Sequence, residues 1–375
     1  VMSGSGSPPA KTGARVSAIR INTNMWKALN FFIQQVYCNE SSSTRFPGID
    51  RGHLAYYTCR MAMYISFPSW IKPEIFSFLP IRWYGLMYIL AFATAYLFIV
   101  IQAKNGEIAL TGEDALDLVM WCVVGLILGA RLFSVLFYDG TAYYLTHPHL
   151  IFWPFRNGKF VGLPGMSYHG GLFGAAAGGW LYSKKKRIPF LEIADTVVYS
   201  VPLGYTFGRL GNFINGELFG RVSTKPWAMV FPDAPSFSTN YEWVRRIADE
   251  LKIPYELGQY INLPRHPSQL YEALFEGVLL FFFLWFVIRP KRREKPAGTG
   301  LAWYLIGYGT VRFVIEYFRS PDEHLGYIIA WGRGSDTIAL FQSVFNISMG
   351  QIFCLIMIVL GVAIRLITHY RSTKQ

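Results

Sequence analysis

Charged side chains are scarce in this sequence, since Asp, Glu, Lys and Arg make up only 15% of its 375 residues. A soluble domain usually carries about 25% charged residues. Hydrophobic residues instead account for 52% of the chain, and aromatic residues for 17%. Low charge together with long apolar runs is typical of a protein that crosses a membrane several times, and it argues against a soluble fold.

Cysteine is also scarce, with four residues (Cys38, Cys59, Cys122 and Cys354) scattered along the chain. The sequence has no Cys-x-x-Cys pair, no cluster of cysteine and histidine, no phosphate-binding Walker loop and no dinucleotide fingerprint. These absences argue against a zinc site, a disulfide framework and a nucleotide cofactor. We therefore expect that any chemistry is carried out without a metal or a cofactor.

The formal net charge of +12 is a feature that nucleic-acid-binding proteins also have. Here, however, the basic residues gather in short runs between apolar segments. Loops on the cytoplasmic side of membrane proteins carry such an excess of lysine and arginine. The charge therefore predicts contact with a lipid bilayer, and no nucleic-acid partner is expected.

Seven apolar segments follow one another along the chain, and six of them are about 18 residues long or longer, enough to cross the hydrocarbon core. The third is shorter but rich in glycine and alanine, which let helices pack closely in lipid, so we expect a central packed helix. The predicted fold class is an all-α polytopic membrane protein with seven transmembrane helices. The predicted segments are Trp83–Gln102, Ala115–Phe137, Gly170–Tyr182, Phe190–Phe207, Leu270–Ile288, Gly300–Phe318 and Gly350–Ile367.

The orientation in the membrane follows from three basic runs, at 184–187, 289–295 and 365–374, which come after the third, fifth and seventh segments. With seven crossings all three lie on one face, which should be cytoplasmic. The N terminus is then outside and the C terminus inside. The long connections lie on the outer face, and the middle one is expected to form a small lobe at about 209–268.

One stretch, residues 208–220, places an arginine, two asparagines and a glutamate at or just past the end of the fourth apolar segment. Polar groups at that depth are costly unless protein or a wet cavity shields them. Four glycines in the same stretch let the backbone bend and approach a ligand closely. The stretch is therefore a candidate functional site, and the alternative is a polar helix end followed by a turn.

The stretch resembles the G-R-x-G-N-F-x-N-x-E-x-x-G signature of the prolipoprotein diacylglyceryl transferase family, and every fixed position of that signature is met. Three further blocks match the same family in the family's order. They are Trp83-Tyr84-Gly85, Gly165-Met166-Ser167-Tyr168-His169-Gly170-Gly171 and Arg265-His266-Pro267-Ser268-Gln269-Leu270-Tyr271-Glu272. The likeness runs from about Met63 to the C terminus.

The resemblance implies a bacterial inner-membrane enzyme of lipoprotein maturation. Such an enzyme moves the diacylglyceryl group of phosphatidylglycerol onto the lipobox cysteine thiol in the signal peptide of a prolipoprotein. A thioether forms and glycerol-1-phosphate leaves. The nucleophilic thiol belongs to the substrate, which fits the lack of a catalytic-looking cysteine in this chain.

The residues supply roles for this chemistry. A free thiol is mostly protonated at neutral pH, so His169 is a candidate general base, with a phosphate oxygen held by arginine as the alternative. Arg209 and Arg312 would bind the phosphate with their guanidinium forks and stabilise it as it leaves. Further candidates for binding phosphatidylglycerol are Tyr84, Asn212, Glu217, Gly220 and Glu316. Secondary candidates are Arg131, His266, Glu272 and Tyr308.

Each of these candidates also has a structural interpretation. Tyr84 could be an aromatic anchor at the membrane interface. Glu316 lies four residues after Arg312 and could simply neutralise it on one helix face. Arg131 could be only an ion-pair partner between helices, and a lone histidine such as His169 is more often structural than catalytic.

Two rival functions remain for the whole chain. Intramembrane charges also mark the pathways of transporters and channels, although here they gather at one side and the two halves show no inverted repeat. A lipid-binding relative without catalytic activity is the other rival. Residues 1–62 fall outside the likeness, and we expect them to be a largely disordered extension upstream of a native start at Met63.

Overall fold

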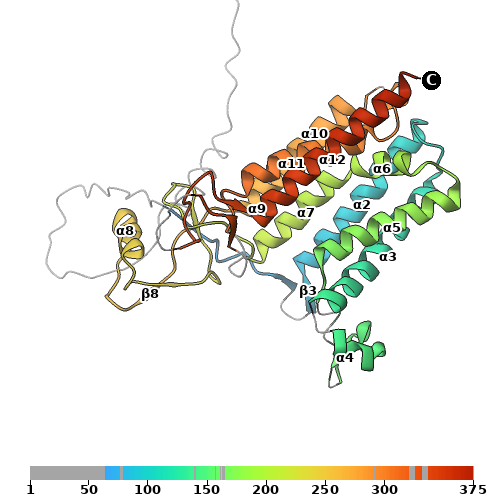
Figure 1. Ribbon diagram of the computed structural model, residues 1–375. Coiled ribbons are helices and arrows are strands. Elements are labelled where there is room, and N and C mark those ends of the chain that lie inside the picture. The colour runs from blue at the N-terminus through green and yellow to red at the C-terminus, as the bar shows by residue number, and fades with distance from the viewer. Residues whose placement is uncertain are drawn as a thin grey trace, which may run out of the picture.

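A computed structural model describes residues 64–374, apart from short gaps at 77–78, 139–140, 157, 161, 163–164, 291, 321–325 and 332–336. The extension expected at 1–62 lies outside the described residues. Long helices run side by side, a smaller lobe carrying α8 and β8 lies at one end of them, and the C terminus lies at the other end (Figure 1).

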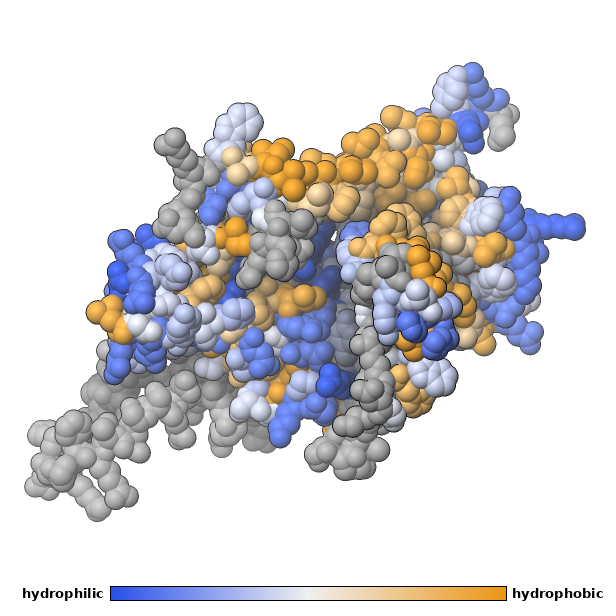
Figure 2. Space-filling model, turned by 60° about the horizontal axis from the view of Figure 1, so that its bottom comes forward, coloured by the Kyte–Doolittle hydropathy of each residue, from blue (hydrophilic) through white to orange (hydrophobic). Residues whose placement is uncertain are grey.

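Among the described residues, four helices are long and apolar enough to cross a membrane: α2 (Trp83–Lys104), α3 (Gly112–Phe137), the helix Ser268–Ile288 and α12 (Met349–Ser372). The chain is therefore a mostly helical polytopic membrane protein. Figure 2 shows hydrophobic surface over the helices, between the hydrophilic surfaces of the lobe and of the opposite end. The remaining helices of the bundle are α5 (Tyr168–Lys186), α6 (Phe190–Val198), α7 (Val201–Ile214) and α11 (Thr299–Ile315).

The helix Ser268–Ile288 is continuous but changes its winding along its length. It begins as α9 (Ser268–Tyr271), passes through the wider π-type turns of η2 (Glu272–Leu279), and continues as α10 (Leu280–Phe282) and η3 (Phe283–Ile288). Such wide turns are rare and often occur at functional sites. Here the first of them begins at Glu272.

The fourth predicted segment, Phe190–Phe207, is wrong as an unbroken helix. The structure divides it into α6 and α7, with Tyr199 and Ser200 between them. Pro202 is the second residue of α7, and a proline lacks the N–H and clashes with the carbonyl four residues back, so α6 cannot continue through it. Helix α7 then extends to Ile214, so Arg209 lies within a helix and not at the start of a connection.

The glycine-rich helix α5 packs against α3 through backbone contact. A Cβ atom added to Gly174 would lie 2.0 Å from the carbonyl oxygen of Gly125, and one added to Gly178 would lie 2.2 Å from that of Trp121. Only glycine permits this approach, as predicted for small residues in lipid. The opposite face of α5 is exposed, for example at Phe173. The helix therefore lies at the edge of the bundle, and its prediction as a central helix is wrong.

The lobe contains helix α8 (Glu242–Leu251), whose buried residues Trp243, Val244 and Leu251 pack with Val222 and Ala339. Within the described ranges, the short strands pair as five two-stranded sheets, one parallel (β1 with β6) and four antiparallel (β2 with β3, β4 with β5, β7 with β8, and β9 with β10). These strands show that the fold is not entirely α-helical. Their bounds are β1 Ile65–Ser66, β2 Glu74–Phe76, β3 Leu79–Arg82, β4 Phe155–Arg156, β5 Lys159–Phe160, β6 Met229–Val230, β7 Phe237–Ser238, β8 Tyr260–Ile261, β9 Tyr327–Ile329 and β10 Ile347–Ser348. The shorter helices are α4 Thr141–Thr146, η1 Pro148–Ile151 and η4 Arg292–Glu294.

Three separate parts of the chain build the lobe. Strand β1, which precedes α2, pairs in parallel with β6. The segment between α7 and α9 contacts the segment between α11 and α12, because the N–H of Val222 donates to the carbonyl of Ala339 (3.0 Å). The lobe is therefore a composite of segments that are separated by helices of the bundle.

The basic loop after Ile288 is tied to neighbouring helices at the end of the bundle opposite the lobe. Arg289 pairs with both carboxylate oxygens of Glu107 (2.6 and 3.0 Å) and lies 3.7 Å from the ring centre of Trp285. Arg292 donates to the side-chain oxygens of Gln102 (2.6 Å) and Thr196 (2.7 Å). These guanidinium groups thus hold helices together.

Candidate active site

A group of three arginines and three glutamates meets inside the protein near the end of the bundle where the lobe begins. Glu272 is at its centre, with its side chain fully buried and three guanidinium groups around it. Arg209 Nε lies 2.8 Å, Arg312 Nη1 3.2 Å and Arg319 Nη1 3.3 Å from its carboxylate oxygens. The arginine–glutamate cluster consists of Arg209, Glu272, Glu276, Arg312, Glu316 and Arg319.

Arg312 contacts all three glutamates of the cluster. Its Nη2 lies 2.8 Å from Glu316, and its Nη1 lies 3.5 Å from Glu276. The pairing between Arg312 and Glu316, predicted from their spacing of four residues, is confirmed. Glu316 also accepts a hydrogen bond from the hydroxyl of Ser348 at the start of α12 (3.1 Å). The cluster therefore links α7, the helix Ser268–Ile288, α11 and α12.

Aromatic residues cover the cluster on one side. The guanidinium of Arg209 lies over the ring of Tyr205, 4.6 Å from its centre. The hydroxyl of Tyr205 donates to Glu276 (2.6 Å) and contacts Glu272 (3.2 Å). Tyr308, a secondary candidate from the sequence, packs edge-on against Tyr205 with 5.8 Å between ring centres. Tyr205 thus borders the cluster directly, and Tyr308 packs behind it.

Tyr205, Glu276 and Arg319 are not among the site residues predicted from the sequence. Two of them had a usable signal, since Tyr205 lies four residues before Arg209 and Glu276 four residues after Glu272. Residues four apart share one face of a helix. Arg319 had no such signal, because it reaches Glu272 from the segment after α11.

The polar residues of the glycine-rich stretch continue from the cluster into the turn after α7. Arg209 donates to the side-chain oxygen of Asn212 (3.4 Å), and the amide of Asn212 donates to Glu217 (2.9 Å). The amide of Asn215 contacts the same carboxylate oxygen (3.3 Å). Gly216 has a φ of 67°, which favours glycine where the chain turns. The turn and the cluster are therefore one connected polar network.

Gly220 lies where three segments of the lobe cross. A Cβ atom there would be 2.3 Å from the carbonyl oxygen of Phe318 and 2.9 Å from the Cβ of His266. Its N–H donates to the carbonyl of His266 (2.8 Å). Gly220 thus allows close backbone packing, and its predicted contact with lipid stays a prediction.

Tyr84 lies beside the glycine-rich stretch, on helix α2. Its ring is so close to Gly211 that a Cβ atom there would be 2.9 Å from the ring. Its hydroxyl lies 3.4 Å from that of Tyr88, which is exposed. The structure therefore brings Tyr84 against Gly211 of α7, which lies between Arg209 and Asn212 in the sequence.

His169 is exposed in the first turn of α5, which begins there because the side chain of Ser167 accepts the N–H of Gly170 and caps the helix. Its ring packs near Tyr168 (5.7 Å) and near Phe353 of α12 (5.6 Å). Within the described residues it makes no hydrogen bond or ion pair with the arginine–glutamate cluster. The two predicted parts of the site, base and phosphate binder, are thus not in direct contact.

Arg131 is also buried, but its partners lie elsewhere. Its guanidinium donates to the carbonyls of Ile151 (2.6 Å) and Gly165 (3.2 Å) and to the hydroxyl of Tyr144 (3.0 Å). These residues belong to the connection between α3 and α5. Arg131 therefore holds that connection in place, and the structure does not bring it to the cluster.

His266 joins the lobe to the start of α9. Its Nδ1 lies 3.1 Å from the hydroxyl of Tyr271, which also accepts a hydrogen bond from the indole N–H of Trp227 (2.7 Å). Burial, together with the positive charges of Lys225 and Arg221, lowers the pKa of His266 to about 4. The neutral ring is therefore the form that fits the folded lobe.

This pKa gives a testable pH dependence of stability. An unfolded histidine has a pKa of about 6.5, so the unfolded chain binds the proton more tightly, and stability falls as the pH drops from 6.5 towards 4. We expect the melting temperature of His266→Asn to depend less on pH in that window than that of the wild type. Thermal unfolding in detergent between pH 4 and 8 measures this, and parallel curves for the two proteins would contradict it.

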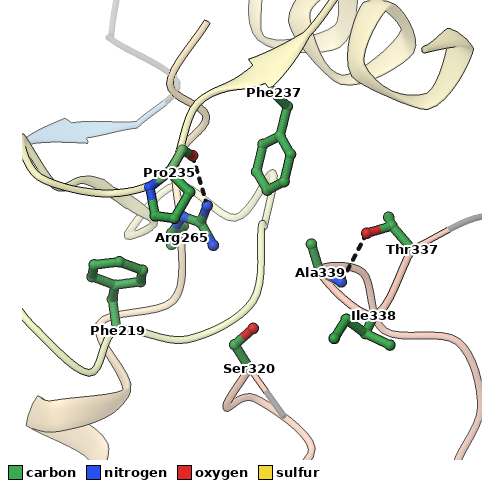
Figure 3. A pocket seen from close by; sticks show the side chains of 8 residues that line it. All are labelled: Phe219, Pro235, Phe237, Arg265, Ser320, Thr337, Ile338 and Ala339. Carbon is green, nitrogen blue, oxygen red and sulfur yellow. Dashed lines mark hydrogen bonds between the residues drawn. The ribbon is translucent and has the colours of Figure 1, made fainter. Parts of the chain in front are cut away.

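A cavity of about 310 Å³ lies in the lobe. Its lining residue Ser320 follows Arg319 of the cluster in the sequence, but none of the cluster residues lines the cavity. It is lined by Phe219, Arg265 and Phe237 on one side and by Ser320 and residues 337–339 on the other (Figure 3). The guanidinium of Arg265 lies between the two aromatic rings, 4.9 and 5.0 Å from their centres, and donates to the carbonyl of Pro235 (3.0 Å). The cavity is mainly apolar, with its cation already engaged by protein.

A polytopic membrane protein with a buried arginine–glutamate cluster is the class that this fold and site define. The chain belongs to the prolipoprotein diacylglyceryl transferase family, whose sequence model matches residues 73–367. It is 46% identical over 333 residues to the phosphatidylglycerol–prolipoprotein diacylglyceryl transferase of Treponema denticola, covering 84% of this chain and 97% of that protein. It is 41% identical over 311 residues to the protein of the same name from Chlorobaculum tepidum, covering 81% and 92%. The resemblance seen in the sequence is confirmed.

Proposed function

We propose that this protein transfers the diacylglyceryl group of phosphatidylglycerol to the lipobox cysteine thiol of prolipoproteins. The sulfur forms a bond to a glycerol carbon of the lipid, the bond from that carbon to the phosphate oxygen breaks, and glycerol-1-phosphate leaves. The thiol proton passes to a base. Membership of the family, and relatives named for this activity over nearly their whole length, support the proposal.

The observation that best supports this function is that Arg209 and Arg312 lie side by side on the carboxylate of Glu272. Both guanidinium groups contact Glu272, and their side chains are 16% and 14% exposed, so each keeps some surface for a ligand. Positive groups that are already held in place stabilise a leaving phosphate without reorganising during the reaction. Arg209 and Arg312 would bind the phosphodiester, and Tyr84, Asn212, Glu217 and Glu316 would complete the binding site.

His169 is the proposed base. Its exposed ring at the entrance of α5 would be accessible to a peptide thiol, while the arginines hold the phosphate elsewhere. A neutral imidazole is suited to accept a proton near neutral pH. A phosphate oxygen bound to arginine is the alternative acceptor, since it would lie next to the reacting carbon.

We also propose a topology of seven crossings in a bacterial inner membrane, with the lobe and the N terminus outside and the C terminus in the cytoplasm. In the part of the chain that the structure describes, four helices have the length and composition of membrane spans. Of the others, α11 has 17 residues, α5 closes with three lysines, and α6 and α7 are interrupted. The lobe lies at one end of the bundle and the basic loop after Ile288 at the other, which supports this orientation.

A transfer assay tests the function. Purified protein in detergent receives phosphatidylglycerol and a lipobox peptide, and mass spectrometry follows the peptide. We expect a mass gain of one diacylglyceryl group on the cysteine peptide, no gain on the same peptide with Cys→Ala, and release of glycerol phosphate. If a folded protein that binds the lipid gives no gain, the chain is a non-catalytic lipid-binding relative.

A further inference from the structure

The charges of the arginine–glutamate cluster balance before any ligand binds. If all six groups are ionised, the three arginines and the three glutamates sum to zero. A phosphodiester headgroup adds one negative charge. An uncompensated charge is expensive at a buried site, so binding the headgroup requires either the loss of a carboxylate contact or the gain of a proton.

The three carboxylates differ in how firmly they are held. Glu272 is contacted by three guanidinium groups. Glu316 has a close ion pair with Arg312 (2.8 Å) and a hydrogen bond from Ser348. Both are therefore stabilised as anions, and neither is suited to take up a proton.

Glu276 is the least stabilised of the three. Its side chain is fully buried, and its ion contact to Arg312 Nη1 is the longest of the cluster, at 3.5 Å. The hydroxyl of Tyr205 donates to Oε2, whereas Oε1 is buried without a hydrogen-bond partner. Oε1, which faces Arg312 Nη1, can therefore take up a proton without the loss of a hydrogen bond.

The groups around Glu276 come from every helix packed against it. The positive charges of Arg312 and Arg209 favour an ionised carboxylate at this position, whereas burial and the negative charge of Glu272 disfavour it. The charged and titratable groups that face it are Tyr205 and Arg209 of α7, Tyr304, Tyr308 and Arg312 of α11, Cys354 of α12, and Glu272 of its own helix.

We propose that Glu276 takes up a proton when the phospholipid headgroup binds, so that the cluster carries one net positive charge for the phosphodiester. This inference rests on the proposed function, because it assumes that the phosphate binds at Arg209 and Arg312. Glu276 is a positioning residue: it does not touch the lipid and acts through Arg312. Neutral Glu276 no longer attracts Arg312 Nη1, which also contacts Glu272 (3.2 Å), so this nitrogen can turn towards the phosphate while Nη2 stays paired with Glu316 (2.8 Å).

Glutamine imitates the protonated side chain, so Glu276→Gln tests the proposal. We expect the variant to transfer lipid at a rate within about threefold of the wild type at neutral pH. For the wild type, KM for phosphatidylglycerol should rise with pH, by up to about tenfold per pH unit, because binding requires a proton. For Glu276→Gln the KM should be nearly independent of pH.

The matched control is Glu272→Gln, the same change one helical turn earlier. Glu272 must stay anionic to hold three arginines, so this variant should lose more than about a hundredfold in kcat/KM. A Glu276→Gln protein that folds and is as inactive as Glu272→Gln would overturn the proposal. So would a wild-type KM that does not change with pH.

Proton uptake provides a measurement that does not depend on turnover. Short-chain phosphatidylglycerol is added to the wild-type protein in weakly buffered detergent without peptide, and a pH indicator follows the proton. We expect uptake of about one proton per bound lipid near neutral pH, and none for Glu276→Gln. Lipid binding by the wild type without uptake refutes the role of Glu276 and leaves the transferase proposal standing, whereas an inactive wild type in the transfer assay refutes the transferase proposal itself.

Discussion

Replacing Arg312 by alanine should abolish lipid transfer. Loss of one group that stabilises the developing charge of a transition state typically costs about 10²–10³ in kcat. Here the loss also leaves Glu272, Glu276 and Glu316 with fewer cations around them, which further disfavours an anionic headgroup. Arg209→Ala should behave in the same way, since Arg209 shares Glu272 with Arg312.

Lysine at either position distinguishes charge from geometry. A lysine keeps the positive charge but lacks the planar fork with which Arg312 contacts Glu272 and Glu316 through different nitrogen atoms. We expect Arg312→Lys to retain partial activity, at least tenfold below the wild type. The mass assay on the lipobox peptide measures the rates, with Arg246→Ala on the exposed face of α8 as a control of unchanged activity. Full activity in Arg312→Ala would remove the cluster from the mechanism.

Replacing Arg221 by alanine should strongly lower the free energy of unfolding of the lobe. Its guanidinium is 3% exposed and donates to the carbonyls of Ile338 (3.1 Å) and Leu340 (2.9 Å) and to the hydroxyl of Tyr327. Buried acceptors that lose their donor cost about 1–3 kcal/mol each, so we expect a loss of about 3 kcal/mol.

The loss should be confined to the lobe. Hydrogen exchange should increase at residues 337–340 and around Val222, whereas helix α12 should remain protected. Arg246→Ala again serves as the control, because it removes an exposed arginine of the same lobe. Equal protection of residues 337–340 in Arg221→Ala and in the wild type would show that these hydrogen bonds do not hold the lobe together.

Apolar patterning predicted the helical stretches of the bundle well, because in lipid a helix must be apolar over most of its length. The break between α6 and α7 was missed although Pro202 signalled it, since hydropathy alone does not register a helix break. The edge position of α5 was also missed, because Gly174 and Gly178 indicate close packing without indicating how many neighbours a helix has.

The residues of the candidate site were likewise predicted only in part from the sequence. Arg209, Arg312 and Glu316 were found as charges on apolar segments, and the ion pair between Arg312 and Glu316 followed from their spacing. The position of Glu272 among three guanidinium groups could not be predicted, because it depends on how three helices are rotated about their axes. Arg221 was missed because it lies in a polar segment, where an arginine does not stand out.

The composite lobe has a consequence for the order in which the protein is made. Strand β1 leaves the ribosome before α2, but its partner β6 is synthesised only after α7. The carbonyls that Arg221 binds come later still, after α11. A nascent chain that ends before Ile338 therefore contains the whole arginine–glutamate cluster in its sequence but cannot complete the lobe beside it. Assembly of the two must therefore follow the synthesis of Leu340.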